Sequence, residues 1–182
     1  KLNIKEGKYI VASVHREENL DIKDNFKNII DGIKKVSKLY GFPVIFSTHP
    51  RTRKKIKSLD TNIDSIQFIN PIGFFDYVQL QSKAFITLSD SGTISEESAM
   101  MGFPAVSLRT STERPEAIDY GNIILGNINE NSIVQSVEIA IGTFETEKMQ
   151  TPKQYQALDV SSRIIKVIQS YTTIVKREIW KE

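Results

Sequence analysis

Hydrophobic residues along the first 150 positions occur in short apolar runs that alternate with segments of helical periodicity. The runs typical of buried strands are residues 8–15, 43–49, 65–71, 85–92, 104–109 and 122–126. The segments that indicate helices are residues 26–40, 51–59, 74–84, 93–101 and 113–121, and a last one through residues 133–141. Six strand–helix units in strict alternation predict an α/β fold, a Rossmann-like doubly wound parallel sheet with right-handed crossovers.

The tail follows a different pattern. Its apolar positions spread over more than one helical face, so a single sheet surface would not cover them. They are Leu158, Val160, Ile164, Ile165, Val167, Ile168, Tyr171, Ile174, Val175, Ile179 and Trp180. A long helix with a frayed end or a dimer contact would explain them, and so would a missing second domain. We therefore divide the chain into a Rossmann-like domain, residues 1–150, and a helical tail, residues 151–182.

Composition excludes several classes of function. Lysine plus arginine number 24 against 22 aspartates and glutamates, which is too even for a nucleic-acid footprint or a membrane-surface patch, so an anionic partner should be small. The chain has no cysteine, which excludes disulfides and thiolate metal sites and fits a reducing cytoplasm. No apolar run has the length of a membrane span, and no signal peptide opens the chain. A first residue of Lys1 suggests a fragment or a processed protein.

Polar residues follow three of the predicted strands. In open parallel sheets ligands bind beyond the carboxyl ends of the strands, so these segments should meet at one edge. The segments are residues 15–19, 90–93 and 109–114. The sequence shows no metal-ligand spacing, no Walker loop and no G-x-G-x-x-G motif, so we expect neither a metal nor a redox cofactor.

The segment SDSGTISEES is the most informative local signal. Its turn, Ser91, Gly92 and Thr93, opens a helix and would present backbone amides and small side chains to phosphate oxygens. Ordinary helix capping is the alternative, because Thr93 with Glu96 resembles a capping box, and without context the cap is favoured. Glu97, one position further, can instead accept hydrogen bonds from two hydroxyls of a ribose.

The two histidines both follow predicted strands. His15 stands beside Arg16, where it has access to an anionic ligand, and a functional role is slightly favoured over a structural one. His49 has the same location, but the basic run after it is better explained as a solvated face.

Two further side chains are candidates for a nucleotide. Arg114 could clamp a diphosphate with its planar guanidinium, or could form a surface ion pair with Glu113 or Glu116. An aromatic ring after the third strand could stack on a base. Among Phe74, Phe75 and Tyr77 we expect Tyr77 to be the exposed one.

Five motifs in one order, VHREEN, THPRTR, SDSGTISEE, GFPAV and TERPEA, closely resemble the carboxy-terminal half of the non-hydrolysing UDP-N-acetylglucosamine 2-epimerases. The resemblance covers nearly the whole chain. It implies the second of two Rossmann-like domains of a glycosyltransferase-B-type fold, with the substrate in the cleft between the domains and most of the UDP on this half.

The resemblance also implies roles for individual residues. It places His15 near the phosphates and the reacting sugar, where it is the candidate catalytic residue, and puts Ser91, Gly92 and Thr93 on the diphosphate. Arg114 would contact the phosphates. The family usually has two glycines after the serine, so Thr93 is a departure that leaves the fit around the phosphate open.

The remaining implied contacts are with the nucleoside. Glu97 would bind the ribose, Ile72 would meet the uracil through its backbone, and Tyr77 would stack on it. The family's more usual HxNP signature reads HPRT here, which argues against an effector site like that of the bacterial enzymes. THPRTR, GFFDY, SGTISEES and the ending SYTTIVKREIW look most like the branch that converts UDP-2-acetamido-2,6-dideoxy-L-talose to UDP-N-acetyl-L-fucosamine for surface polysaccharides.

The family reaction removes the C2 proton while UDP leaves C1, which gives a glycal. UDP then returns, with a proton on the opposite face of C2, and no redox cofactor is required. In the family the acid and base carboxylates lie on an amino-terminal domain absent from these residues, and the full-length protein would be a homodimer. We therefore expect the chain to bind UDP and to be inactive alone. The alternatives are the UDP-binding half of a glycosyltransferase-B transferase and a non-catalytic binding module.

Overall fold

The computed structural model describes residues 2–22, 24–57, 63–147 and 149–182. The chain divides into two compact units, Lys1–Pro152 and Lys153–Glu182. The first unit contains the sheet, and the second contains the tail helices.

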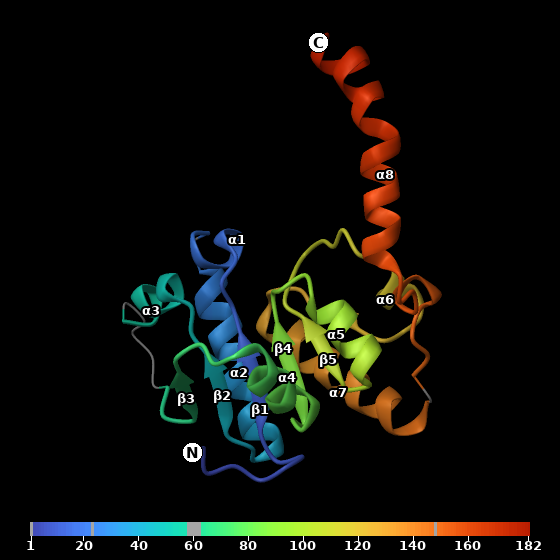
Figure 1. The fold of residues 1–182 in the computed structure, drawn as a ribbon. Helices are drawn as coiled ribbons and strands as arrows, with labels where there is room; N and C mark the ends of the chain where they lie inside the picture. The colour runs from blue at the N-terminus through green and yellow to red at the C-terminus, as the bar shows by residue number, and fades with distance from the viewer. Residues whose placement is uncertain (1, 23, 58–62, 148) are drawn as a thin grey trace. The chain divides into compact units, whose positions relative to one another are not determined.

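All six strands of the first unit lie in one parallel sheet, which confirms the predicted doubly wound fold (Figure 1). The strands are β1 Ile10–Ser13, β2 Val44–Ser47, β3 Ile66–Ile69, β4 Ile86–Ser89, β5 Ala105–Ser107 and β6 Ile124–Leu125. They are shorter than the predicted runs because the last residues of each run leave the sheet. The order is β3-β2-β1-β4-β5-β6, so the direction of winding reverses between β1 and β4. Ligands of such sheets bind at that reversal.

The helices of the first unit follow the predicted alternation with one addition. They are α1 Glu17–Leu20, α2 Asn25–Tyr40, α3 Pro50–Lys57, α4 Phe74–Ser82, α5 Ile94–Met101, α6 Glu116–Asp119 and α7 Glu130–Thr146. The short α1 was not predicted. Gly41 and Gly102 end α2 and α5 in the left-handed conformation that glycine adopts without strain. The last two residues of the helix predicted over 51–59, residues 58–59, lie outside the described residues.

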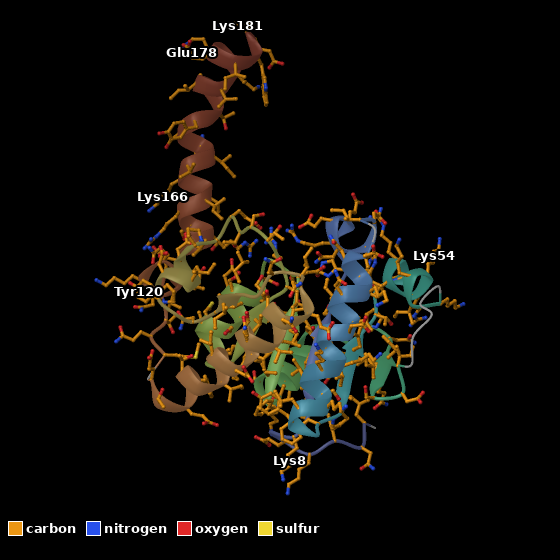
Figure 2. All side chains as sticks on the ribbon, turned by 180° about the vertical axis from the view of Figure 1, so that it is seen from behind. Lys8, Lys54, Tyr120, Lys166, Glu178 and Lys181 are labelled. Carbon is orange, nitrogen blue, oxygen red and sulfur yellow. The ribbon has the colours of Figure 1, made fainter. Side chains whose placement is uncertain are left out.

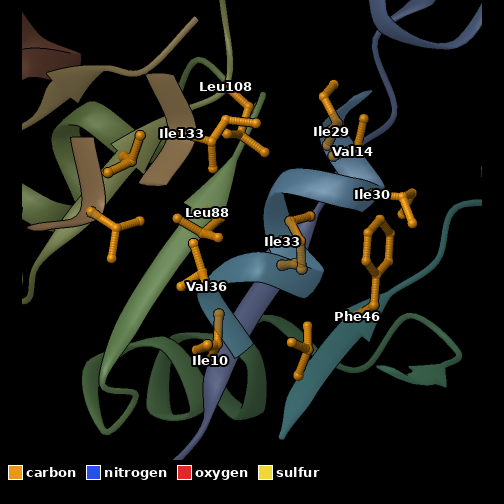
Figure 3. Close-up of a cluster of buried hydrophobic side chains, with 14 of the residues drawn as sticks. Ile10, Val14, Ile29, Ile30, Ile33, Val36, Phe46, Leu88, Leu108 and Ile133 are labelled. Atoms are coloured by element: carbon orange, nitrogen blue, oxygen red, sulfur yellow. The ribbon is translucent and has the colours of Figure 1, made fainter. Parts of the chain in front are cut away.

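Helices cover both faces of the sheet. Ile33 of α2 and Ile133 of α7 belong to one cluster with Ile10 of β1 and Leu88 of β4, and all four are fully buried (Figure 3). The opposite face of β1 packs against α4. Alternate residues of one strand therefore face opposite layers, and their burial on both sides explains the unbroken apolar runs in the sequence.

The second unit is helical. It consists of η1 Lys153–Tyr155, α8 Val160–Val175 and η2 Lys176–Trp180, the last with π-helical geometry. All of α8 is described, and none of its side chains is buried. Ile179 and Trp180 are 69% and 61% exposed, as expected from the apolar surplus in the tail.

Gly32 provides a test of the α2–α7 contact. A β-carbon at this position would lie 2.8 Å from Ile133 Cδ1, inside van der Waals distance. Alanine normally stabilises a helix interior relative to glycine, but here overpacking should prevail, and we expect Gly32→Ala to lower the free energy of unfolding by about 1–2 kcal/mol. Urea denaturation measures this change.

Gly142→Ala in α7 is the matched control. A β-carbon there meets nothing within 4 Å, so the same substitution should raise the free energy of unfolding by up to about 1 kcal/mol. Equal effects of the two substitutions would contradict close packing of α2 on α7.

Candidate functional site

The predicted polar edge exists at the carboxyl ends of β1, β4 and β5. The segments after these strands are joined by hydrogen bonds and ion pairs between residues far apart in the sequence, among them His15 with Asp90. Figure 2 shows Lys8, just before β1, at the opposite edge of the sheet from Lys54 on α3. The structure thus gathers chemistry-bearing side chains at the edge where parallel sheets bind ligands.

Asp90 is the centre of this edge. Its carboxylate is fully buried and accepts hydrogen bonds from the backbone amides of His15 and Arg16 and from Asn19 Nδ2, at 2.9–3.1 Å. Burial alone would raise the pKa of Asp90, but the bonds from His15, Arg16 and Asn19 together hold that pKa below its usual value. The carboxylate is therefore ionised in a buried place, where only several donors can stabilise it.

His15 completes this arrangement. Its Nδ1 atom lies 3.1 Å from Asp90 Oδ1, and 43% of the side chain is exposed toward the edge of the sheet. The hydrogen bond to Asp90 raises the pKa of His15, against opposing effects of burial and of Arg16. A partly exposed imidazole with a raised pKa suits contact with an anion.

The serine–glycine–threonine turn precedes α5 as predicted. Ser89 Oγ accepts a hydrogen bond from the Ser91 amide at 3.1 Å, and the hydroxyls of Ser91 and Thr93 lie 3.0 Å apart. The alternative of a capping box is wrong. The Thr93 side chain makes no capping bond, because its residue has helical backbone angles, and Glu96 bonds an arginine instead. Among the first amides of α5, that of Ser95 donates to the Gly92 carbonyl at 3.4 Å and that of Glu97 to the Thr93 carbonyl at 2.9 Å.

Gly92 lies directly against Arg114. A β-carbon on Gly92 would come within 3.3 Å of Arg114 Cζ and 3.2 Å of Glu113 Oε1. The Arg114 guanidinium bonds Glu96 Oε1 at 2.6 Å and lies 3.8 Å from Glu113, which is one of the surface partners considered from the sequence. The Ser91–Thr93 turn, the Arg114 guanidinium and the start of α5 therefore lie close together.

Glu113 is surrounded by arginines. Its carboxylate lies 2.7 Å from Arg109, 3.7 Å from Arg16 and 3.8 Å from Arg114. The bond from Arg109 is the main reason that the pKa of Glu113 falls to about 2. Arg109 is 5% exposed. Glu18 and Glu96 pair with Arg16 and Arg114 as well, so three carboxylates balance the three guanidinium groups, and a diphosphate would exchange with them.

Glu97 is held by a residue that sequence reasoning missed. Gln81 of α4 is 1% exposed, and its Nε2 donates to Glu97 Oε2 at 3.0 Å. The bond links α4 to α5 and fixes the direction of the predicted ribose-binding carboxylate. No pattern in the sequence indicates this bond, because the two residues lie on different helices.

The prediction that Tyr77 is the exposed aromatic residue is wrong. Phe74 and Phe75, in the first turn of α4, are 63% and 86% exposed, whereas Tyr77 packs toward the sheet. Burial raises the pKa of Tyr77 to about 12. Phe75 precedes Tyr77 by two residues, which is about 200° around the helix, so these two side chains face nearly opposite directions. Ile72, just before α4, is 39% exposed, and its predicted backbone contact is compatible with this position.

The basic segment after β2 is largely solvated, as expected. Arg51, on α3, pairs with Glu17 of α1, and His49 is exposed with its ring 6.3 Å from that of His15. Within the described ranges no three His, Asp or Glu side chains lie close enough together to hold a metal ion. The helices described include none that is long and apolar enough to cross a membrane.

Comparison with known proteins agrees with this geometry. Residues 1–169 match the family model described as UDP-N-acetylglucosamine 2-epimerase. The chain belongs to the UDP-N-acetylglucosamine 2-epimerase family. The resemblance predicted from the five motifs is thereby confirmed.

Individual relatives extend the comparison. The UDP-N-acetylglucosamine 2-epimerase of Methanocaldococcus jannaschii is 36% identical over 138 residues, which are 73% of this chain and 38% of that protein. A structure of that organism's enzyme in complex with UDP-GlcNAc and UDP matches with a TM-score of 0.78 at 32% identity, over 90% of this chain and 45% of that one. The enzyme of Rickettsia bellii gives a TM-score of 0.79 at 32% identity, over 98% and 48%. The chain thus spans less than half the length of these epimerases.

The His15–Asp90 pair predicts a pH-dependent stability. Because its folded-state pKa is raised, protonated His15 contributes stability that is complete below the unfolded value of about 6.5 and is lost as the pH rises through the folded value. His15→Gln should therefore cost more at low pH, by less than about 1 kcal/mol since solvent screens a side chain this exposed. Urea denaturation of the chain and the variant across this range measures the difference.

His49→Gln is the control for the loss of an imidazole. It should retain the pH-dependent component that His15→Gln removes. A cost of His15→Gln that stays constant, or grows with rising pH, would contradict the ion pair.

Proposed function

We propose that this chain is the UDP-binding half of a nucleotide-sugar C2 epimerase that acts on a UDP-N-acetylhexosamine for surface polysaccharide synthesis. The observation that carries the proposal is the turn at Ser91–Thr93, which opens α5 directly against Arg114 in a chain of the epimerase family. Relatives solved with UDP-GlcNAc and UDP support the nucleotide.

The site suggests a place for each part of the nucleotide. The diphosphate would bind the turn amides and Arg114, with His15 beside it, and Glu97 would accept the ribose hydroxyls. The uracil would then lie near the start of α4, against the Ile72 backbone and Tyr77. The exposed rings of Phe74 and Phe75 flank this place.

In the proposed reaction a base removes the proton from C2 while the C1–O bond breaks, and the electron pair of that bond leaves with the diphosphate. The product is UDP and a glycal, and the reverse addition delivers a proton to the opposite face of C2. This chain would stabilise the departing charge through amides, Arg114 and His15. The C2 base would come from an amino-terminal domain, as the resemblance to the family implies.

The whole protein would be larger than the described chain. Its relatives are more than twice as long, so we propose that an amino-terminal domain completes the cleft and that the apolar tail around Ile179 and Trp180 packs on it. A nucleotide-sugar substrate would place the protein in the cytoplasm, and a homodimer is the expected assembly. The motifs in this sequence favour the branch that acts on UDP-2-acetamido-2,6-dideoxy-L-talose.

Calorimetric titration with UDP tests the site. Arg114→Ala removes charged hydrogen bonds and should weaken UDP binding about 10-fold or more. Gly92→Ala should have a comparable effect, because its methyl group would push Arg114 aside and block close approach of the phosphate. Ser91→Ala should weaken binding about threefold to tenfold.

Arg163→Ala is the matched control. Arg163 lies on α8 of the second unit, pairs with Asp159 and is exposed, so its loss removes one positive charge that is not part of the proposed site. It should leave UDP binding unchanged. If all four variants bind UDP equally, the nucleotide does not occupy the proposed site.

Epimerisation by the chain alone is the second test. An open half-site does not exclude water and lacks the C2 base, so incubation with UDP-GlcNAc in D₂O should give no deuterium at C2 by NMR. Incorporation of deuterium by the purified chain would contradict the division of labour between two domains.

A further inference from the structure

We propose that Asp90 is a positioning residue that acts through His15, holding its Nδ1–H so that Nε2 always meets the diphosphate. This inference rests on the proposed function, because it assigns a residue to the same site. Asp90 follows β4 and His15 follows β1, and the direction of winding of the sheet reverses between these two strands.

The geometry fixes which ring nitrogen carries a proton. Asp90 Oδ1 lies 3.1 Å from His15 Nδ1, and an ionised carboxylate can only accept. Nδ1 must therefore be the donor in both protonation states of the ring. In the imidazolium Nε2 is also a donor, and it points to the far side of the ring from Asp90.

The carboxylate has no freedom to turn away. Its Oδ2 atom accepts from Arg16 N, His15 N and Asn19 Nδ2, at 2.9–3.0 Å. Asn19 itself is 2% exposed and is held by a second bond to the Leu108 carbonyl. A carboxylate fixed by three donors presents its other oxygen to His15 in one direction, which orients the imidazole as second partners orient catalytic histidines generally.

The charged groups around the ring and its nearest aromatic neighbour come from three elements. Asp90 follows β4, Arg16 follows β1 and opposes protonation, and His49 follows β2 with its ring tilted by 44°. Tyr77 of α4 lies near Asp90 and stays neutral below a pKa of about 12. Asp90 is thus the anion that favours the imidazolium. By favouring the imidazolium, Asp90 would keep an N–H donor at Nε2 of His15 for the departing diphosphate while the C1–O bond breaks.

If Asp90 had only a structural role, it would join the segments after β1 and β4 without determining which nitrogen of His15 carries the proton. Imidazole ¹⁵N NMR of the chain without nucleotide separates the two roles. We expect Nδ1 to remain protonated throughout the titration, with a His15 pKa above the ordinary value of about 6.5. Since the chain has two histidines, His49→Gln assigns the His15 signals.

Asp90→Asn should lower the His15 pKa by about half a pH unit or more. Asn19→Ala is the control, because it removes another bond to the same carboxylate and leaves the imidazole contact in place. It should leave the His15 tautomer and pKa nearly unchanged. If Asp90→Asn does not fold, the unsubstituted chain still decides: a predominant Nε2–H tautomer, or a pKa at or below the ordinary value, overturns the proposal.

Titration of UDP at several pH values connects the pair to the ligand. UDP should bind more weakly as the pH rises through the His15 pKa, and in Asp90→Asn this decline should move to lower pH. A decline that does not move in Asp90→Asn contradicts the proposal. Absence of UDP binding at every pH, with the expected NMR tautomer, would instead overturn the proposed function and leave the Asp90–His15 pair standing.

Discussion

The ionised carboxylate of Asp90 lies fully buried between the ends of β1 and β4, and such a charge is stable only when several donors surround it. The donors here are the backbone and side chain of His15, the Arg16 amide and Asn19. These bonds fold the segment after β1 onto the segment after β4. Because the turn proposed to bind phosphate begins at the next residue, Ser91, one interaction places both the histidine and the turn.

Electrostatic balance is the second property of this edge. Arg16, Arg109 and Arg114 converge on Glu113, and Arg114 also binds Glu96. A diphosphate entering the proposed site would compete with these carboxylates for the guanidinium groups. The carboxylates keep the arginines oriented while no ligand is present, so binding exchanges one set of charged hydrogen bonds for another. Affinity then depends on the difference between the two sets.

The sequence predicted the six strands and their order of alternation because strands buried on both faces are uniformly apolar. It did not predict α1, whose four residues are too few for a periodic pattern. The importance of Asp90 was also missed, since its partners lie about 75 positions away and no local spacing reveals them. The exposure of Tyr77 was predicted wrongly because the sequence cannot say which side of a short helix faces the sheet.

The structure brings His15, Gly92 and Arg114 to one edge of the sheet, as their places after predicted strands indicated, but their partners required coordinates. Glu96 was read as part of a cap, and the structure shows it as a partner of Arg114. The bond from Gln81 to Glu97 likewise joins helices that sequence spacing cannot relate. The sequence predicts which residues lie at the carboxyl edge of the sheet. Only the structure shows which of these residues bond to one another.

The central claim is that UDP binds at the carboxyl ends of β1, β4 and β5. A crystal structure of the chain with UDP tests it most directly. The account predicts the diphosphate within hydrogen-bond distance of the Ser91–Thr93 amides and of Arg114, with the uracil beside the start of α4. UDP bound elsewhere, for example in the groove lined by Ile4, Gln67 and Lys83, would contradict it.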